Sequence, residues 1–381
     1  MRVLHVVHAF QTGGAERVVL NLARYASEDV ANWICSLTQP HDLLSQLDTT
    51  RTGFCCLKKQ EGNDFAVPRK LAELIDAQRI DVVHTQAWGT YIESLLAAKY
   101  LAKRKPPLIF AFHGKSLPEV ERGVPLRQRL TQRVANFFTD ACVAPARHMA
   151  EEYARTNWLA ARGMQVIPNG VDTEALQRVA GVRGQLGLGL REDEVVVGFV
   201  GRLDPVKDLT GVIATFASLR QKLGGQRARL LLIGDGPERD TVRQAIAAQG
   251  LQECVIAAGL RSDITRCMSS MDIYFQPSRY EGHSITLLEA MSCSLPVVST
   301  RVGGTPEIVL HGKTGFLHEP GQYAAMEESL LRLCSDPDLR ASLGRAGRDF
   351  IVSRYSVQAM VRSYERLYRQ LLGSENKSCA A

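Results

Sequence analysis

Residues 272–300 read DIYFQPSRYEGHSITLLEAMSCSLPVVST, and this run predicts a strand, a helix and a second strand. A strand over Asp272–Gln276 ends at Pro277, and Ser284 is a favourable N-cap residue for the helix that follows. Pro296 then precedes a second apolar strand. Because a strand, a helix and a strand in this order form a parallel pair with a crossover helix, the run predicts an α/β fold.

The same alternation of short apolar runs and helix-length segments extends over most of the 381 residues. Strands that are apolar almost throughout are typical of parallel sheets covered by helices on both faces. The glycine-rich run 172–194 separates two series of such strands, which predicts two doubly wound domains, 1–175 and 176–355, with a cleft between them. The predicted strands are Val3–Val7, Trp33–Leu37, Gly53–Leu57, Asp81–His84, Leu108–Phe112, Ala141–Ala144, Gln165–Ile167, Val195–Val200, Arg229–Ile233, Cys254–Ala258, Asp272–Gln276, Pro296–Thr300 and Gly315–Leu317.

The composition excludes several classes of protein. The chain has 46 Lys and Arg against 40 Asp and Glu, a formal charge of +6, and 45% hydrophobic residues. These values exclude a disordered or fibrous chain, and the apolar runs are too short for a membrane-spanning helix. Residues 1–10 predict a first strand rather than a signal peptide, and the nine cysteines form no C-x-x-C pair, so we expect reduced thiols in a cytoplasmic protein. No nucleic-acid-binding motif accompanies the basic pI, so no nucleic acid partner is expected.

A glycine pair follows the first predicted strand. Gly13 and Gly14 lie where the chain should turn from this strand into a helix, and glycine there lets backbone N–H groups approach an anion. A tight turn is the simpler explanation of the pair. A dinucleotide-binding fingerprint is not indicated, since G-x-G-x-x-G is absent and no acidic residue ends the second strand.

Two cations follow the strand predicted at 195–200. Arg202 and Lys207 stand beside a glycine and a helix start, where an arginine fork and a lysine point charge suit a diphosphate. One alternative is a solvated pair of cations, and another is an ion pair between Lys207 and Asp204. From these residues alone the alternatives stay open.

Two glutamates flank the start of the helix that Ser284 caps. Glu281 precedes the helix and Glu289 lies inside it, about 12 Å further on if the eight residues between them were all helical. That separation disfavours an acid–base dyad and favours contacts with two different hydroxyl groups of one extended ligand. The backbone N–H groups of Ser284, Ile285 and Thr286 would then face an anion. Alternatively, Glu281 is an acid favoured by the helix dipole and Glu289 is a surface residue.

Seven sequence blocks occur together and in order, and together they resemble the retaining, nucleotide-sugar-dependent glycosyltransferases of family 4 (glycosyl transferases group 1). The resemblance covers nearly the whole chain and implies the GT-B fold, in which two Rossmann-like domains face a cleft. It also implies that the last helix, within residues 356–381, crosses back to the first domain. The blocks are GGAER at 13–17, HG at 113–114, PNGVD at 168–172, GRLDPVK at 201–207, GDGPE at 234–238, EGHSITLLEA at 281–290 and VGGTPE at 302–307.

The resemblance implies roles for residues of the second domain. Glu281, the first residue of the family's E-x7-E pair, is expected to hold hydroxyl groups of the donor sugar at the reaction centre. Glu289, the second, is expected to bind the ribose of the nucleotide. Arg202 and Lys207 match the cations that neutralise the diphosphate.

Two further matches fall in the first domain. Gly14 matches a loop glycine that approaches the phosphates, and His113 matches a histidine near the donor sugar. A structural hydrogen bond at a strand end is the alternative role for His113. The sequence departs from many family members at His283 and Ser284, which bears on the donor-sugar contacts but not on the two glutamates.

The implied reaction is transfer of a hexosyl group from a nucleotide-diphosphate sugar to a hydroxyl group of a glycan or lipid-linked acceptor. Such a reaction would serve the synthesis of cell-envelope polysaccharide or lipopolysaccharide. A UDP-sugar is the first expectation for the donor and GDP-mannose the second. No cofactor is expected, and no catalytic metal either, since no D-x-D stands at a strand end. Two alternatives stay open: a nucleotide-sugar epimerase on the same fold, and a donor-binding protein without turnover.

Positive charge is concentrated in residues 99–133. This stretch holds nine cations against two acids, Glu119 and Glu121, which gives it a net charge of +7. Basic residues beside apolar ones are typical of proteins that bind anionic lipid surfaces, and a solvated helix face is the alternative. We therefore expect a cytoplasmic protein that meets its acceptor at the inner face of the cytoplasmic membrane.

Overall fold

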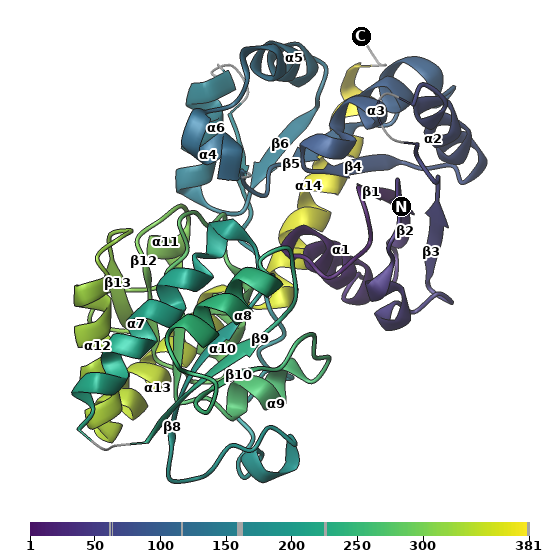
Figure 1. Cartoon of the computed structure of the whole chain (residues 1–381). Helices are drawn as coiled ribbons and strands as arrows, with labels where there is room; N and C mark the ends of the chain where they lie inside the picture. Colours follow the sequence, from purple (N-terminus) through teal and green to yellow (C-terminus); the bar gives the residue numbers. More distant parts are fainter. Residues whose placement is uncertain (61, 63, 116, 158–162, 225–226, 379–381) are drawn as a thin grey trace. The chain divides into compact units, whose positions relative to one another are not determined.

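The computed structural model describes residues 1–60, 62, 64–115, 117–157, 163–224 and 227–378, so that Cys379 lies outside the described residues. Contacts divide the chain into two units (Figure 1). The first unit contains Met1–Lys115, Glu121–Gly170 and Val357–Ala381, and the second contains Ser116–Val120 and Val171–Ser356. The sequence predicts domain boundaries after residues 175 and 355. In the structure the chain passes from the first unit to the second after residue 170 and returns after residue 356.

The first unit is built on a seven-stranded sheet in the order β3-β2-β1-β4-β5-β6-β7, and every pairing in it is parallel. The strand order reverses between β1 and β4, the kind of position at which open α/β sheets bind ligands. The strands are β1 (Arg2–Val7), β2 (Ala31–Ser36), β3 (Thr52–Cys56), β4 (Val82–Gln86), β5 (Leu108–Ala111), β6 (Ala141–Ala144) and β7 (Gln165–Val166).

Alternate residues of the central strands enter two separate cores of the first unit. Leu4 and Val6 of β1 pack into one cluster, whereas Val7 of β1 and Ile34 of β2 pack into another. This alternation follows from the two-residue period of a strand and shows that both faces of the sheet are covered. The helical segments up to β7 are α1 (Gly14–Arg24), η1 (Asp42–Gln46), α2 (Ala66–Ala77), η2 (Trp88–Thr90), α3 (Tyr91–Leu96), η3 (Ala97–Leu101), α4 (Leu117–Arg122), α5 (Leu126–Phe137) and α6 (Arg147–Asn157).

The C-terminal helix α14 (Val357–Ser378) belongs to the first unit. Its buried face includes Tyr364 and Tyr368, and the hydroxyl of Tyr368 lies 2.9 Å from Nδ1 of His84 on β4. Glu365 of α14 accepts a 2.8 Å hydrogen bond from the backbone N–H of Ser27. The return of the last helix to the first domain, which the resemblance implies, is confirmed.

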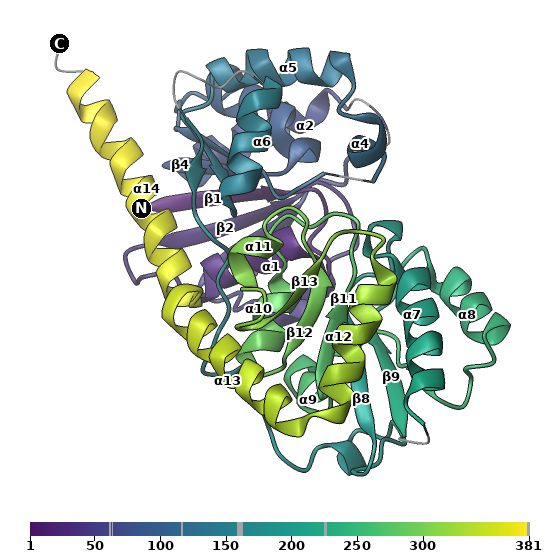
Figure 2. The ribbon, with the colours of Figure 1, turned by 90° about the vertical axis from the view of Figure 1, so that its left-hand side faces the viewer.

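The second unit is built on a six-stranded parallel sheet in the order β10-β9-β8-β11-β12-β13, again with the order reversing beside its first strand (Figure 2). In this unit α7 packs against α8 and α12, and α10 packs against α13. The strands are β8 (Val195–Val200), β9 (Ala228–Ile233), β10 (Val255–Ala257), β11 (Ile273–Gln276), β12 (Val297–Thr300) and β13 (Gly315–His318). The helical segments are η4 (Arg183–Gln185), η5 (Pro205–Lys207), α7 (Leu209–Lys222), α8 (Arg239–Ala248), α9 (Ile264–Ser269), α10 (Ile285–Ser292), α11 (Thr305–Ile308), α12 (Tyr323–Ser335) and α13 (Pro337–Arg354).

The strand predictions from the sequence are confirmed, since each of the thirteen predicted runs overlaps one of β1–β13. The cysteines of the described chain are free thiols and most of them are buried, as predicted. Among the described residues, no helix is both long and apolar enough to cross a membrane.

Candidate active site

The run 272–300 places Glu281 in the loop between β11 and α10. Ser284 caps α10, and its Oγ accepts a 3.4 Å hydrogen bond from the backbone N–H of Leu287, as predicted. The loop is fixed from its other side by Gly304, whose N–H donates to the carbonyl of Gly282 at 2.8 Å. The neighbouring Gly303 has φ +50°, and a Cβ there would lie 1.6 Å from the carbonyl oxygen of Glu281. Only glycine fits at this position, which explains why a glycine stands at 303 in the VGGTPE block.

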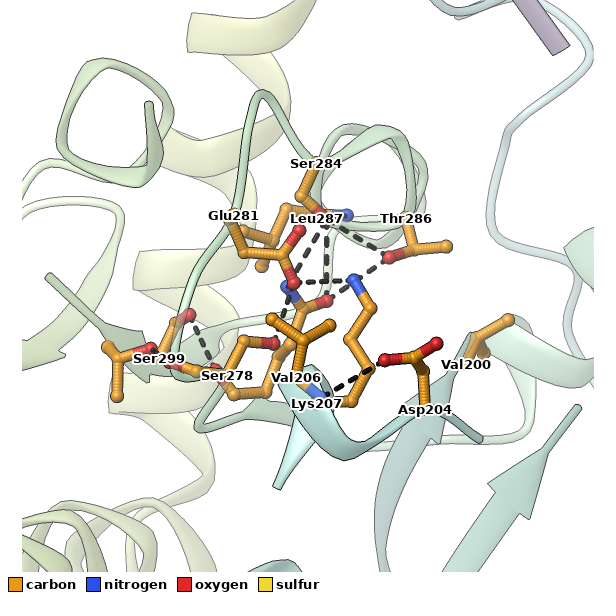
Figure 3. Close-up of polar contacts among 12 residues, drawn as sticks. Val200, Asp204, Val206, Lys207, Ser278, Glu281, Ser284, Thr286, Leu287 and Ser299 are labelled. Carbon is orange, nitrogen blue, oxygen red and sulfur yellow. Dashed lines mark hydrogen bonds and ion pairs between the residues drawn. The ribbon is translucent and has the colours of Figure 1, made fainter. Parts of the chain in front are cut away.

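The carboxylate of Glu281 is the centre of a dense polar cluster (Figure 3). Its Oε1 accepts three hydrogen bonds: from Nζ of Lys207 at 2.6 Å, from Nε2 of Gln276 at 2.7 Å and from Oγ of Ser278 at 2.6 Å. Glu281 is buried, with 6% of its surface exposed. A buried carboxylate persists only when it is paired and hydrogen-bonded, and here one oxygen alone receives a cation and two neutral donors.

Lys207 reaches Glu281 because the chain around it is held by other contacts. Asp204 caps η5 and accepts a 3.2 Å bond from the backbone N–H of Val206, while the N–H of Arg279 donates to the carbonyl of Val206 at 2.8 Å. Asp208, which follows Lys207, has φ +55°, a conformation that costs a non-glycine residue energy. An ion pair of Lys207 with Asp204, one of the alternatives from the sequence, is therefore wrong: the ammonium group pairs with Glu281 and Asp204 serves as a cap.

Arg202 does not join this cluster. Its Nε lies 3.9 Å from Oδ2 of Asp204, and 60% of its side chain is exposed. The two cations of the GRLDPVK block thus differ, since Lys207 is half-buried and fixed whereas Arg202 is largely in solvent.

Gln276 is a site residue that the sequence analysis missed. Its Oε1 accepts hydrogen bonds from the hydroxyl of Tyr274 at 3.0 Å and from Oγ1 of Thr286 at 3.1 Å, while its Nε2 donates to Glu281. Ser284 completes the network, with its Oγ 3.1 Å from Oγ1 of Thr286. The signal for Gln276 in the sequence is a polar residue that ends an apolar strand directly before Pro277, and hence stands at the carboxyl edge of the sheet.

Ile285 and Glu289 both lie on α10 and are buried. Glu289 has 9% of its surface exposed, so the alternative in which it is a surface residue is wrong. Its carbonyl accepts the N–H of Cys293 at 3.0 Å, as expected within a helix end. The backbone N–H groups at the first turn of α10 are among those that a helix does not satisfy internally.

The two predicted site residues of the first unit lie in the segments that follow strands β1 and β5. Gly14 is the first residue of α1, and neither Gly13 nor Gly14 has a positive φ, so a tight turn does not require this glycine pair. A Cβ on Gly14 would meet no heavy atom of the described chain within 4 Å. The space beside Gly14 is therefore open to a larger residue or to another molecule.

His113 follows β5 and pairs with the last residue of β4. Its Nε2 lies 2.6 Å from Oε1 of Gln86, and since a carbonyl oxygen only accepts, the ring proton resides on Nε2 and leaves Nδ1 as an acceptor. Burial lowers the pKa of His113 to about 4, so the ring is neutral at pH 7. The structural hydrogen bond considered from the sequence is thus present, and it also fixes the tautomer.

The predicted site residues therefore divide between the units. In the second unit, Gln276 is hydrogen-bonded to Glu281, Ser284 and Thr286, and Lys207 joins this cluster through Glu281. Arg202, Ile285 and Glu289 belong to that unit too, and Gly14 and His113 belong to the first.

Two known families match the chain, one for each half. The family described as Glycosyltransferase Family 4 matches residues 12–175, and the family described as Glycosyl transferases group 1 matches residues 187–350. The chain belongs to the family 4 (group 1) glycosyltransferases. Its parallel sheets are those of the GT-B fold.

Individual glycosyltransferases are similar over most of their length. The chain is 24% identical over 312 residues to N-acetyl-alpha-D-glucosaminyl L-malate synthase of Bacillus anthracis, covering 81% of this chain and 80% of that protein. It is 24% identical over 274 residues to the capsular polysaccharide biosynthesis glycosyltransferase CapM of Staphylococcus aureus, covering 71% and 72%. The structure of Anabaena HepE in complex with UDP and glucose has a TM-score of 0.83 at 21% identity, and covers 97% of this chain and all of that one.

Proposed function

We propose that this glycosyltransferase moves a hexosyl group from a nucleotide-diphosphate sugar to a hydroxyl group of a glycan or lipid-linked acceptor, with retention at the anomeric carbon. The observation that carries the proposal is the contact of Lys207 with Glu281, which places a cation and a carboxylate together at the carboxyl edge of the second sheet. One end of a sugar diphosphate needs positive charge and the other needs acceptors for its hydroxyl groups. This pair offers both within a few ångströms.

Lys207 is proposed to bind the diphosphate while it stays bonded to Glu281. An ammonium group has three N–H donors, and Oε1 of Glu281 takes one of them. The remaining donors, the guanidinium of Arg202 and the N–H groups of Ser284, Ile285 and Thr286 are proposed to neutralise the diphosphate. Positive groups aimed at the leaving phosphate stabilise the charge that grows on it as the bond breaks.

Glu281 and Glu289 are proposed to bind hydroxyl groups at the two ends of the donor. Oε1 of Glu281 already accepts three bonds, so Oε2 is the oxygen proposed to accept from the sugar. Glu289, the fifth residue of α10, is proposed to accept from the ribose. In the first unit His113 is proposed to accept from the sugar through Nδ1, and Gly14 to let a phosphate approach the start of α1.

The proposed chemical step occurs on one face of the sugar. The bond between C1 and the phosphate oxygen breaks, and its electron pair leaves with the diphosphate. The acceptor oxygen forms its bond to C1 on the same face, and its proton passes to the departing phosphate oxygen. The charge is neutralised in this proposal by Lys207 and Arg202, without a metal or a cofactor.

We propose a UDP-sugar as the donor, with GDP-mannose second, and a cytoplasmic role in cell-envelope polysaccharide or lipopolysaccharide synthesis. The support is the fold shared with HepE, which was solved with UDP and glucose, and the similarity to CapM, a capsular polysaccharide enzyme by name. The sequence identities to HepE and CapM are both below 25%. These similarities therefore support the fold and indicate which ligands to test first.

The test is a thermal-shift screen of the purified chain against UDP-glucose, UDP-N-acetylglucosamine and GDP-mannose, followed by turnover of the stabilising donor. NMR of the released or transferred sugar should show the α-anomer from an α-linked donor. Lys207→Ala should abolish the thermal shift, whereas Lys313→Ala, a change at an exposed lysine of the same unit, should preserve it. Inversion at C1 contradicts the proposed step, and conversion of the donor into an isomeric sugar nucleotide without acceptor indicates an epimerase.

A further inference from the structure

Helix α5 carries a row of exposed apolar side chains. Leu126, Leu130, Val134 and Phe137 follow one another at spacings of four, four and three residues, which places them on one face of the helix. They are 68%, 50%, 63% and 77% exposed, respectively. Figures 1 and 2 both show α5 at an outer edge of the first unit, where it packs beside α6.

The face of α5 that is buried in the first unit is polar or small. Its buried residues are Gln132, Ala135 and Asn136, and Oδ1 of Asn136 accepts a 2.8 Å hydrogen bond from the hydroxyl of Tyr91. An ordinary surface helix buries its apolar stripe and exposes its polar face. Because α5 does the reverse, its apolar row does not serve the core of the unit.

The charge of α5 has a single sign. Its sequence LRQRLTQRVANF contains three arginines and no acid. At about 100° per residue, Arg127 lies on one side of the apolar row, and Arg129 and Arg133 lie on the other. Beyond the end of the helix, Phe138 contacts Tyr100 with ring centroids 5.9 Å apart, and both rings are exposed.

Ion pairs reduce the net positive charge of the basic stretch 99–133. Three of the nine cations pair with acids from outside the stretch: Lys99 with Asp140 at 2.6 Å, Arg104 with Asp81 at 3.0 Å and Lys115 with Glu152 at 2.5 Å. These cations are neutralised locally. Of the other six cations, Arg127, Arg129 and Arg133 belong to α5. Arg127 is exposed beside the apolar row, whereas Arg129 and Arg133 are half-buried and the guanidinium of Arg129 donates to the carbonyl of Thr156 at 3.5 Å.

We propose that this surface, the α5 ridge (Leu126, Arg127, Arg129, Leu130, Arg133, Val134, Phe137 and Phe138), docks on an anionic lipid bilayer with the helix axis in the plane of the membrane. A helix binds in this way when apolar side chains enter the acyl boundary and flanking cations reach the headgroups. A second copy of the chain is disfavoured as the occupant, because it would bring two surfaces of the same positive sign together. The inference concerns membrane binding alone and does not depend on the proposed donor or reaction.

The test is flotation of the purified chain with vesicles of phosphatidylcholine, with and without about one third phosphatidylglycerol. Wild-type protein should float with the anionic vesicles at low salt and be released at high salt. Arg127→Glu should weaken the partition at least about tenfold, because one favourable charge is lost and an unfavourable one is added. Phe137→Ser and Leu126→Ser, at opposite ends of the ridge, should each weaken it by about tenfold or more.

Matched control variants come from helix α2 and its start in the same unit. Phe65→Ser replaces a phenylalanine that is 83% exposed and Arg69→Glu reverses an exposed charge, and both should float like wild type. All the substituted side chains are exposed, so melting temperatures should be unchanged. The inference is overturned if wild-type protein ignores anionic vesicles at low salt or if the ridge variants float as well as wild type. It is also overturned if Phe137→Ser dissociates a dimer in solution without changing flotation.

Discussion

A glutamine ends the fourth strand of each sheet, Gln86 in the first unit and Gln276 in the second, and each holds one candidate site residue. Both strands lie next to the first strand of their sheet, so the two glutamines occupy equivalent positions. Gln86 accepts from the neutral ring of His113 at 2.6 Å, whereas Gln276 donates to the carboxylate of Glu281 at 2.7 Å. Similar strand ends thus support different partners.

The two environments differ in how completely their hydrogen bonds are made. Gln276 has partners at both ends of its amide, and its neighbour Glu281 is also paired with Lys207. Nε2 of Gln86 is buried and has no partner among the described residues. The hydrogen bonds at the end of β11 thus converge on the charged carboxylate of Glu281, whereas the bond at the end of β4 joins the neutral ring of His113. Charge-removing substitutions should therefore affect the second unit most.

The largest effect is expected from Glu281→Gln. The new side chain has nearly the same shape and can still accept from Lys207 and Ser278, but it lacks the negative charge. We expect kcat to fall about 10²–10³-fold, as when a single electrostatic group is removed from an active site, with little change in melting temperature. Donor turnover and thermal melts measure the two quantities. Full activity would show that the charge of Glu281 is dispensable.

Gln276→Leu should lower the free energy of unfolding by about 2–3 kcal/mol. The change keeps the volume but leaves buried hydrogen-bonding groups of Tyr274, Thr286 and Glu281 with one partner fewer. Urea unfolding measures the difference, with Gln249→Leu at an exposed position as the control. An equal loss in the two variants would contradict the role given to Gln276.

Acid should destabilise both units, because each contains a buried histidine. In this property the two units are alike. Burial lowers the pKa of His5 in the first unit to about 4 and that of His283 in the second to about 3. The unfolded chain takes up protons below about pH 6.5 whereas the folded chain does not, so stability is lost as pH falls from about 6.5 toward 4. We expect a loss on the order of 2 kcal/mol per histidine at pH 5 relative to pH 7.

Urea unfolding of wild type, His283→Leu and His8→Gln at both pH values tests this expectation. His283→Leu should lose about 2 kcal/mol less stability than wild type between pH 7 and pH 5, whereas His8→Gln, at an exposed position, should behave like wild type. Unchanged wild-type stability between pH 7 and pH 5 would contradict the neutral state of these rings.

The smallest effect is expected from Gln86→Leu, at about 1 kcal/mol. The variant loses the bond to His113 but also removes a buried amide group whose Nε2 has no partner among the described residues, and these changes offset one another. The ring of His113 should lose its fixed tautomer, which ¹⁵N NMR of the histidine detects. If Gln86→Leu lowered the free energy of unfolding as much as Gln276→Leu does, the two glutamines would be equally important for stability, which contradicts this account.

The sequence predicts the strands well because apolar runs such as Val195–Val200 mark buried parallel strands directly. The helix start at Ser284 is equally local, since a cap depends on residues within one turn. The contact of Lys207 with Glu281 could not be predicted from spacing, because it joins residues 74 positions apart and depends on the neighbourhood of β8 and β11. The ion pairs of the basic stretch could not be predicted for the same reason, because Asp81, Asp140 and Glu152 lie outside it in the sequence.

The most direct test of the account is calorimetric binding of UDP and GDP to wild type, Lys207→Ala and Glu281→Gln. The account assigns Lys207 to the diphosphate and Glu281 to the sugar. For the nucleotide that binds wild type, Lys207→Ala should therefore weaken binding at least about tenfold, about 1.4 kcal/mol, whereas Glu281→Gln should stay within about twofold. Equal binding by wild type and Lys207→Ala would contradict the central claim that the pair formed by Lys207, after β8, and Glu281, after β11, holds the donor.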